Sequence, residues 1–513
     1  MLDLGKTFIQ TLERCPNHLA IVDGNLRYSY QQWAQVIGGL QHALKDRGLR
    51  KGDRILSILQ NRFEAATLHW ACQMAGITIV PINWRSKPEE IDYCVNNSRA
   101  NLVFYEDVSA DAFSSSEACR DLSSIYCGDP TGGLKQSQHF AEVMTLVRDP
   151  SPEASADDYS LMLYTSGTTG KPKGVPRLHH AERAAAIAHI VQNQYRSGES
   201  SLGVMPLYHT MGVRTLLALC IGNGTFVALP KWNTEIALDL IEQEKISHLY
   251  LVPTLYHDLI ESEKFREDRI HSVKKLGFAG APMHDGLLIK LNAIFKPELF
   301  VNHYGSSEIY TFTVNKDAVA KPGSAGVAGI NSRIRVVRFD DQNKTSSCMD
   351  VTSVNEEGQI ICDLASDEAF SGYWERPDAD AKSLRGCWYF TGDTGYVDQE
   401  GDLYVTGRVD DMIISGGENI SPVEIESVLS LHPAVSEVAV AGISDDRLGQ
   451  KVVAFVKAKE KINAEALDGY CRTSDLQNFK RPREYVFIKD IPKSPVGKIL
   501  RRKLVAHEYE LAE

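Results

Sequence analysis

The sequence lacks the features that would assign it to a membrane, secreted or nucleic-acid-coating protein. No apolar run in its 513 residues is long enough to span a bilayer, and the N-terminus has no secretory leader. Positive charge is in deficit: 55 Lys and Arg stand against 67 Asp and Glu, for a formal net charge of −12. This balance disfavours a protein that coats nucleic acid or an anionic membrane. We therefore expect a cytoplasmic protein with neither kind of partner.

Paired cysteines are also missing. The ten cysteines are scattered and none forms a Cys-x-x-Cys pair, so a zinc site or a disulfide framework has little support. Hydrophobic residues make up 43% of the chain, which is enough to bury sizeable cores in two to four domains. No internal repeat stands out.

Short apolar runs alternate with helical patterns along the chain, and this alternation predicts an α/β fold with layered sheets. The expected strands are residues 54–59, 77–82, 102–105, 161–164, 225–229, 248–252 and 275–279. Several of these runs end in Gly, Ser, Thr or Pro, as strands do where they empty into loops at the working edge of a sheet.

The last hundred or so residues form a candidate second domain. Ser421 can cap a helix, Pro422 suits its first position, and Glu424 can close a capping box. Residues 437–441 and 451–456 resemble strands. The preceding polar stretch, residues 407–411, could link two domains.

The most informative segment is Tyr-Thr-Ser-Gly-Thr-Thr-Gly-Lys-Pro-Lys-Gly, residues 164–174. Glycines let the backbone approach a ligand closely, while hydroxyls, free backbone N–H groups and two lysines suit phosphate. Only two residues separate Gly167 from Gly170, so the segment is not a Walker P-loop. We interpret it as a phosphate cradle of another kind.

This string resembles the phosphate loop of the acyl-adenylate-forming enzymes, the AMP-dependent synthetase and ligase superfamily of acyl-CoA synthetases, adenylation domains and firefly luciferase. The resemblance implies that the loop binds ATP through Thr165, Ser166, Gly167, Thr168, Thr169, Gly170, Lys171 and Lys173.

Further motifs follow in the order typical of that superfamily. Tyr304-Gly-Ser-Ser-Glu308 resembles its Tyr-Gly-x-Thr-Glu motif, which implies that Tyr304, Gly305, Ser306 and Ser307 contact the nucleotide and that Glu308 holds magnesium. Ser307 replaces the usual threonine and keeps its hydroxyl. Tyr389-Phe-Thr-Gly-Asp393 resembles the motif whose aspartate binds ribose, and Arg408 would make a second ribose or phosphate contact.

The resemblance also implies a division of the chain and a mobile C-terminal unit. It implies a large N-terminal domain at residues 1–408, with a β-barrel-like subdomain, a hinge at 409–411 around Asp410, and a small α+β domain at 412–513. Pro-Lys-Ser-Pro-Val-Gly-Lys, residues 492–498, resembles the motif whose lysine stabilises charge during adenylation, so Lys498 is the expected catalytic lysine.

The acceptor and the acid are inferred from finer resemblances to benzoate, chlorobenzoate and furoate CoA ligases. They rest on residues 205–212, 278–283 and 498–502. The implied CoA contacts are Arg85, Gly416, Gly417, Phe479, Arg481 and Arg483. The acyl pocket is expected at His209, which could also gate the two steps, and at Tyr250, Gly280, Ala281, and Ile309 or Tyr310. No acid stands at Thr210 or Met211, which disfavours an amino-acid substrate.

The resemblance therefore implies an acid–CoA ligase that uses ATP, magnesium and coenzyme A to convert a small aromatic or heteroaromatic carboxylate. Four alternatives stay open: a stand-alone aryl-acid adenylating enzyme that loads a carrier protein, a medium-chain or alicyclic acyl-CoA synthetase, a nucleotide-binding homologue without activity, and a luciferase-like oxidation. The chain ends soon after Leu504, so we expect an external acyl acceptor. A homodimer is also left open.

Overall fold

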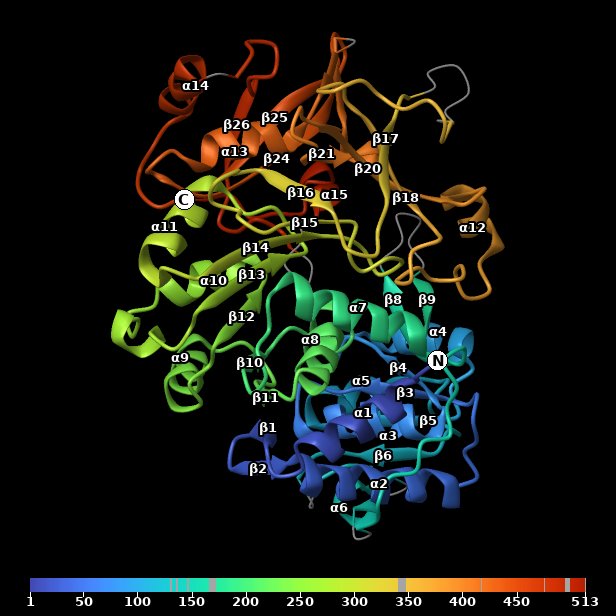
Figure 1. Ribbon diagram of the computed structural model, residues 1–513. Coiled ribbons are helices and arrows are strands. Elements are labelled where there is room, and N and C mark those ends of the chain that lie inside the picture. Colours follow the sequence, from blue (N-terminus) through green and yellow to red (C-terminus); the bar gives the residue numbers. More distant parts are fainter. Residues whose placement is uncertain are drawn as a thin grey trace.

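The computed structural model describes residues 1–129, 132–134, 137–144, 147–165, 172–339, 347–416, 418–474, 476–493 and 499–512, with backbone only at 410, 418 and 419. These residues form a large N-terminal unit of sheets and helices and a smaller C-terminal unit. In Figure 1 the C-terminal unit lies at the end of the molecule away from the N-terminus. The expected α/β class, with a large and a small domain, is confirmed. No described helix is long and apolar enough to cross a membrane.

A seven-stranded sheet lies in the half of the N-terminal unit that contains the N-terminus (Figure 1). Its strands, in spatial order, are β7 (Gln138–His139), β6 (Ser124–Tyr126), β5 (Leu102–Tyr105), β3 (Arg54–Ile58), β4 (Thr78–Pro81), β8 (Tyr159–Thr165) and β9 (Lys173–Leu178). All neighbours pair in parallel except the β8–β9 hairpin, which carries the glycine-rich loop at its tip.

A second, larger sheet of fourteen described strands runs through the rest of the N-terminal unit. In spatial order it contains β17 (Ile334–Val337), β18 (Gly358–Asp363), β20 (Trp388–Val397), β21 (Leu403–Arg408), β16 (Ser324–Ala328), β15 (Thr313–Asn315), β14 (Leu299–Tyr304), β13 (Lys275–Ala279), β12 (His248–Leu251), β10 (Ser200–Gly203), β11 (Thr225–Ala228), β1 (Leu19–Asp23) and β2 (Leu26–Ser29), while β19 (Leu384–Arg385) pairs with β20. Strands β10 to β14 are parallel, whereas β15 to β21 are antiparallel and extend the sheet where the barrel-like subdomain is expected.

Helices fill three layers around the two sheets. The helices of the N-terminal unit are α1 (Leu4–Arg14), α2 (Tyr30–Asp46), α3 (Phe63–Ala75), α4 (Pro88–Ser98), α5 (Asp107–Ser115), α6 (Phe140–Val143), α7 (His179–Gln192), α8 (Thr210–Ile221), α9 (Thr234–Gln243), α10 (Pro253–Ile260), η1 (Glu267–Ile270), α11 (Asp285–Phe295) and α12 (Pro377–Ser383). Helices α1, α2, α3, α7 and α8 share one core with side chains of both sheets, such as Ile55 and Phe226. Helices α4 and α5 cover the outer face of the smaller sheet, and α9 to α11 that of the larger one.

Local sequence explains where several helices begin and end. Ser29 and Gln32 form a capping box at the start of α2. Pro88 and Pro253 open α4 and α10, where a missing N–H costs nothing. Gly76 ends α3 at φ 68°, a left-handed conformation that glycine adopts readily.

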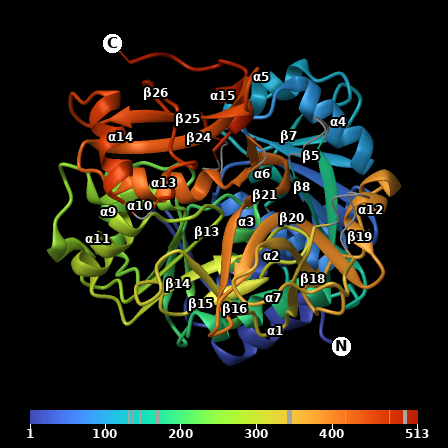
Figure 2. The same cartoon turned by 90° about the horizontal axis from the view of Figure 1, so that it is seen from above.

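The C-terminal unit follows the short 3-10 helix η2 (Val409–Asp411). Its sheet contains β23 (Glu418–Ile420), β22 (Ile413–Ser415), β25 (Gly449–Ala458) and β24 (Val435–Asp445), with β26 (Glu484–Phe487) paired to β25. Helices α13 (Pro422–Ser430) and α14 (Ala464–Thr473) pack on one face, and α15 (Arg501–Val505) on the other. Figure 2 shows this sheet crossing above the N-terminal unit.

The capping box expected at residues 421–424 is wrong, although Pro422 does open α13. The Ser421 hydroxyl donates to the Thr406 carbonyl at the end of the N-terminal unit, and Glu424 pairs with Lys480 at 2.7 Å. A contact between the two units therefore takes the hydroxyl that would have capped the helix. The predicted strands are all present, with bounds that agree at β5 and β13 and differ by one to four residues elsewhere.

Candidate functional site

Three of the predicted nucleotide residues meet where β14 ends beside β20 and β21. The Tyr304 hydroxyl donates a 2.5 Å hydrogen bond to Asp393 Oδ2. Arg408 Nη1 lies 2.9 Å from Asp393 Oδ1, its register partner across the β20–β21 pair. Burial, reinforced by the charge of Asp393, raises the pKa of Tyr304 well above its usual value, so the hydroxyl stays a donor. Asp393 is thus fixed from both sides as an acceptor.

A second cluster joins Glu308 to the base of the glycine-rich loop. Glu308 is 6% exposed, and its Oε1 accepts a 2.6 Å hydrogen bond from the Tyr373 hydroxyl. The Lys173 ammonium lies 4.1 Å from the centroid of the same tyrosine ring. Burial lowers the pKa of Lys173, and the charge of Glu308 opposes that shift. Tyr373, which the sequence did not single out, therefore connects a predicted metal ligand with a predicted phosphate ligand.

The fit of Glu308 to a magnesium ion can be judged from its surroundings. Within the described ranges, no group of three or more His, Cys, Asp and Glu side chains could hold a metal by itself. Mg²⁺ usually keeps several waters and is bound through one or two carboxylates together with substrate phosphates. A single buried carboxylate beside a phosphate loop fits that mode of binding.

The two ends of the glycine-rich loop are firmly held. Thr165 pairs with Lys173 and Tyr164 with Gly174 at the loop end of the β8–β9 hairpin. Gly174 O also accepts a 2.9 Å hydrogen bond from the Trp374 N–H. The loop residues between these ends, namely Ser166, Gly167, Thr168, Thr169, Gly170 and Lys171, lie outside the described residues. The described end of the hairpin thus places Lys173 near Glu308, through Tyr373.

The residues between Tyr304 and Glu308 form a tight turn. A Cβ on Gly305 would lie 2.1 Å from the Tyr310 carbonyl oxygen, so only glycine fits there. The Ser306 N–H donates to the Ile309 carbonyl at 3.0 Å, and the Ser306 hydroxyl accepts from the Glu308 N–H at 3.2 Å. Ser307 is half-buried in the same turn. This turn sets the direction of Glu308.

The predicted acyl-pocket residues divide into two groups. Tyr250 shares a small apolar cluster with Met211 and Val252. Met211 and Val252 are also the side chains nearest to Gly280, which Ala281 follows in the sequence. His209 caps α8 by accepting a 3.3 Å hydrogen bond from the Met211 N–H.

Ile309 and Tyr310 lie in other cores. Ile309 packs with Val175 and Phe312. The Tyr310 hydroxyl donates to Glu182 at 3.1 Å, and its ring lies under the Arg177 guanidinium at 4.1 Å. The structure therefore groups Tyr250 with Gly280 and separates both from Ile309.

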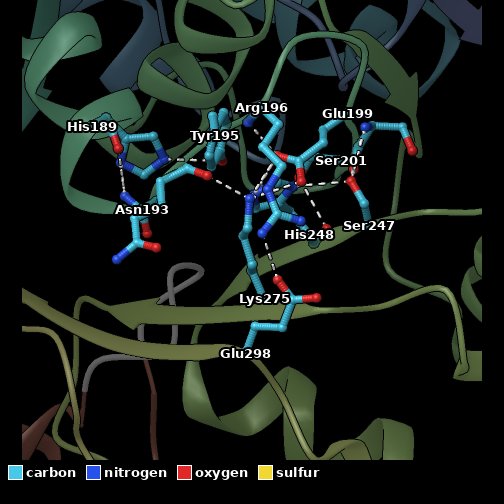
Figure 3. Close-up of polar contacts among 12 residues, drawn as sticks. His189, Asn193, Tyr195, Arg196, Glu199, Ser201, Ser247, His248, Lys275 and Glu298 are labelled. Atoms are coloured by element: carbon cyan, nitrogen blue, oxygen red, sulfur yellow. Dashed lines mark hydrogen bonds and ion pairs between the residues drawn. The ribbon is translucent and has the colours of Figure 1, made fainter.

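The Tyr250 ring lies 4.7 Å from that of His189, which belongs to a polar network that the sequence did not reveal. Figure 3 shows this network. Asn193 contacts one nitrogen of His189, and the Tyr195 hydroxyl lies 3.1 Å from the other. The Tyr195 ring lies 4.0 Å from that of His248, which is 3.2 Å from a Glu199 oxygen. No motif marks these side chains: four of them lie between residues 189 and 199, and only the fold brings His248 beside Tyr195 and Glu199.

The expected coenzyme A contacts lie on both units. Arg85 follows β4, and its guanidinium lies 3.7 Å from the Trp84 ring centroid. On the C-terminal unit, Phe479 and Arg483 are exposed, while Arg481 forms a 2.5 Å ion pair with Asp468. The cationic groups are therefore available except at Arg481, whose charge is already matched.

The predicted hinge lies at the edge of the described residues, and the predicted catalytic lysine lies outside them. Asp410 belongs by its backbone to η2, directly after Arg408. Gly416 turns the β22–β23 hairpin at φ 61°, and its N–H donates to the Leu448 carbonyl at 2.9 Å. Gly417 and Lys498 lie outside the described residues.

Comparison with known proteins matches this geometry to a family. The family model described as AMP-binding enzyme matches residues 8–374, and the model of its C-terminal domain matches residues 424–498. A 4-chlorobenzoate–CoA ligase of Arthrobacter sp is 30% identical over 96% of this chain and 92% of its own length. A long-chain-fatty-acid–CoA ligase of Mycobacterium tuberculosis is 31% identical over 94% of this chain and 93% of its own.

The same similarity extends to a solved structure with a bound intermediate. The structure of an anthranilate CoA ligase in complex with anthranoyl-AMP has a TM-score of 0.91 and 25% sequence identity, and the match covers 99% of this chain and 97% of that one. The two family models together span most of the sequence. The chain belongs to the AMP-binding enzyme family.

Proposed function

We propose that this AMP-forming carboxylate–CoA ligase acts on a small aromatic or heteroaromatic acid, which it activates as an acyl-adenylate before transfer to coenzyme A. One observation carries the proposal: Tyr304 and Arg408 hold the Asp393 carboxylate from two sides, and Tyr373 joins the nearby Glu308 to Lys173. The 4-chlorobenzoate and anthranilate relatives favour a ring acid, whereas the fatty-acid relative keeps a chain acid as the alternative.

In the first half-reaction the carboxylate attacks the α-phosphate of ATP and pyrophosphate leaves. The loop from Thr165 to Lys173 would hold the phosphates, and Asp393 would accept hydrogen bonds from the ribose hydroxyls. Glu308, oriented by Tyr373, would bind Mg²⁺, which when bound neutralises phosphate charge. The Lys498 ammonium would stabilise the charge that builds as the carboxylate oxygen reaches phosphorus.

In the second half-reaction the coenzyme A thiol attacks the acyl-adenylate. We expect the C-terminal unit to turn about Asp410, which withdraws Lys498 and brings in the hairpin at Gly416 and Gly417. His209 would gate the thiol's access. Phosphates of coenzyme A would meet Arg85 and Arg483, whereas the charge of Arg481 is already matched by Asp468. The adenine would stack on Phe479. AMP is a good leaving group from a mixed anhydride, so no protein nucleophile is needed.

The experiment uses the full-length protein with Mg²⁺, ATP, coenzyme A and a panel of acids. The panel contains benzoate, chlorobenzoates, furoate, cyclohexane carboxylate and medium-chain fatty acids, and it is read out by pyrophosphate release and by acyl-CoA formation. A preference for ring acids supports the proposal. A preference for chain acids replaces the substrate, and pyrophosphate release without acyl-CoA, together with acylation of a carrier protein, replaces the acceptor.

A further inference from the structure

Four buried polar side chains from four different elements meet beside the predicted acyl pocket. His189 comes from α7, Arg214 from α8, Tyr250 from β12 and His303 from β14, and none is more than 3% exposed. The Tyr250 ring lies 4.7 Å from that of His189 and 5.6 Å from that of His303. Polar groups buried this deeply are normally fully hydrogen-bonded, so each unpaired atom among them needs an explanation.

The cluster lies at the edge of the sheet where ligands of such folds bind. Tyr250 and His303 stand near the carboxyl ends of parallel strands, and ligands of open α/β sheets bind outside those ends. His303 pairs with Ala279, the residue before Gly280, and is itself followed by Tyr304. The cluster is therefore joined directly to both the proposed nucleotide site and the proposed acyl pocket.

Three hydrogen-bond donors in this cluster have no acceptor in the described part of the chain. Asn193 Nδ2 lies 3.1 Å from His303 Nε2, which leaves the ring proton on Nδ1, an atom without a partner. Arg214 donates to Thr311 at 2.8 Å and to the Tyr250 hydroxyl, while its Nε has no partner. Tyr250 accepts that bond and keeps its own proton available.

The protonation states agree with this set of donors. Burial holds the pKa of His303 well below its usual value, so the ring is neutral and carries one proton. Burial also raises the pKa of Tyr250, although Arg214 opposes the shift, so its hydroxyl stays protonated near neutral pH. A ligand atom placed between these groups must therefore accept hydrogen bonds.

The fourth side chain of the cluster, His189, is held in place by hydrogen-bond partners on both ring nitrogens. His189 uses both ring nitrogens on Asn193 and Tyr195, and Figure 3 follows the chain of contacts onward to His248, Glu199 and Lys275. His189 is thus a positioning residue. The donors left without an acceptor are those of Arg214, Tyr250 and His303.

A buried acid completes the surroundings. Glu368 is 0% exposed and its Oε2 has no hydrogen-bond partner. Burial raises the pKa of this carboxyl, and the charges of Arg214 and Arg177 partly offset the shift. The unpaired Arg214 Nε needs an acceptor and the unpaired Glu368 Oε2 needs a donor, and a hydroxyl of a ligand or a water molecule can supply both.

We propose that the acid activated by this enzyme carries a second oxygen group, a hydroxyl, carbonyl or carboxylate, that accepts hydrogen bonds from Arg214, Tyr250 and His303. This inference rests on the proposed function, since it concerns the acid of the same adenylation reaction. A site built to hydrogen-bond a substrate oxygen rejects the analogue that lacks it, because its own buried donors are then left unpaired.

The test compares size-matched acids in the complete reaction with the wild-type protein. Probes are benzoate, its 3- and 4-hydroxy, 3- and 4-acetyl and 3- and 4-chloro derivatives, and the 3- and 4-carboxy diacids. We expect kcat/KM for at least one oxygen-bearing acid to exceed that of its chloro counterpart by about tenfold or more. The preferred oxygen-bearing acid also shows whether the second oxygen group is neutral, as in the hydroxy and acetyl acids, or a carboxylate, as in the diacids.

Two tyrosine variants make the test specific. Tyr250→Phe removes one donor, and we expect it to lower the hydroxy-to-chloro ratio of kcat/KM by about tenfold. Tyr256→Phe is the matched control: it removes a buried hydroxyl bonded to the Leu249 and Gly277 carbonyls outside the cluster, and should leave that ratio unchanged. Arg214→Met should lower the ratio further, and Tyr250→Phe suffices where that variant does not fold.

The outcomes separate this inference from the proposed function. Acyl-CoA formation with equal or better use of the chloro acids, unchanged by Tyr250→Phe, means that buried water satisfies the donors, and it overturns the inference alone. Failure to form acyl-CoA or pyrophosphate from any acid overturns the proposed function instead.

Discussion

The Tyr373 hydroxyl donates a 2.6 Å hydrogen bond to Glu308 Oε1, although 65 positions separate the two residues in the sequence. The same ring lies beneath the Lys173 ammonium. One tyrosine therefore fixes the carboxylate proposed to bind Mg²⁺ and packs against a lysine proposed to bind phosphate.

Tyr373→Phe removes that hydrogen bond and leaves the ring. A hydrogen bond to a charged group is worth about 1.5–3 kcal/mol, so we expect kcat/KM for magnesium-ATP to fall by about tenfold or more, with a higher Mg²⁺ requirement. Pyrophosphate release over a Mg²⁺ titration measures both. The control is Tyr396→Phe, whose ring stacks on Tyr404 at 5.0 Å. An unchanged Mg²⁺ dependence in Tyr373→Phe would contradict the role given to this contact.

Asp393→Asn tests the ribose site. The variant keeps the shape but loses the charged acceptor, so we expect a loss of about 10- to 100-fold in kcat/KM for ATP. The sharper measurement compares ATP with 2′-deoxy-ATP and 3′-deoxy-ATP in pyrophosphate release. The wild-type protein should discriminate against at least one deoxynucleotide, and the variant should not.

A matched substitution checks that the effect is local. Asp350→Asn changes an exposed carboxylate that pairs with Arg338 at 2.7 Å, and it should preserve the discrimination. If Asp393→Asn discriminates as the wild type does, the ribose is bound elsewhere.

What the sequence predicts well is what neighbouring residues determine. The runs at 102–105 and 275–279 become β5 and β13 with the same bounds. A strand of a parallel sheet that is buried on both faces is a nearly continuous apolar run, and such a run can be recognised in the sequence. Tyr304 and Asp393 were found through contiguous motifs, and the fold brings them within 2.5 Å of one another.

What the sequence does not predict depends on contacts between distant segments. Ser421 was expected to cap α13, but the Thr406 carbonyl takes its hydroxyl. Tyr373 and Arg214 stand in no motif, and their roles appear only when Glu308 and Tyr250 lie beside them. The sequence assigned Ile309 and Tyr250 to one pocket because of their motifs. In the structure they belong to different apolar clusters, which only the packing of the fold determines.

Glu426→Ala should destabilise the C-terminal unit strongly. Glu426 is 1% exposed and binds Arg501 through both oxygens, at 2.6 and 2.7 Å. Removing Glu426 leaves the partly buried Arg501 guanidinium with the more distant carboxylate of Asp411, at 3.7 Å, and breaking a buried pair in this way costs up to about 3–5 kcal/mol. Thermal unfolding of the full-length protein measures the change. Glu424→Ala, on the same helix, breaks a more exposed ion pair with Lys480 and should cost less than about 1 kcal/mol.

Lys498→Ala should separate the two half-reactions. We expect pyrophosphate release from acid and ATP to be abolished, while coenzyme A still reacts with supplied acyl-adenylate, because the lysine stabilises charge in the first step only. Lys493→Ala, which breaks a 2.6 Å contact with Glu437, is the nearby control and should retain adenylation. Equal loss of both half-reactions would remove Lys498 from its assigned role.

Protonation of His284 should loosen the packing of the two units. This histidine precedes α11 of the N-terminal unit and interacts with Glu437 and Lys493 of the C-terminal unit; burial lowers its pKa to about 4. When the units separate, the pKa of His284 should return towards its usual value of 6.5. The separated form therefore binds the proton more readily, so the packed arrangement keeps its full stability above pH 6.5 and loses it as pH falls towards 4.

Fluorescence energy transfer between labels on α11 and α14 measures this equilibrium between pH 8 and pH 5. We expect the transfer efficiency of the wild-type protein to change on acidification, and that of His284→Gln, which cannot be protonated in this range, to stay nearly constant. His271→Gln alters an exposed histidine of the N-terminal unit and should respond as the wild type does. An identical pH response in His284→Gln would assign the sensitivity to other groups, because Gln fills a similar volume and differs from His in lacking the titrating proton.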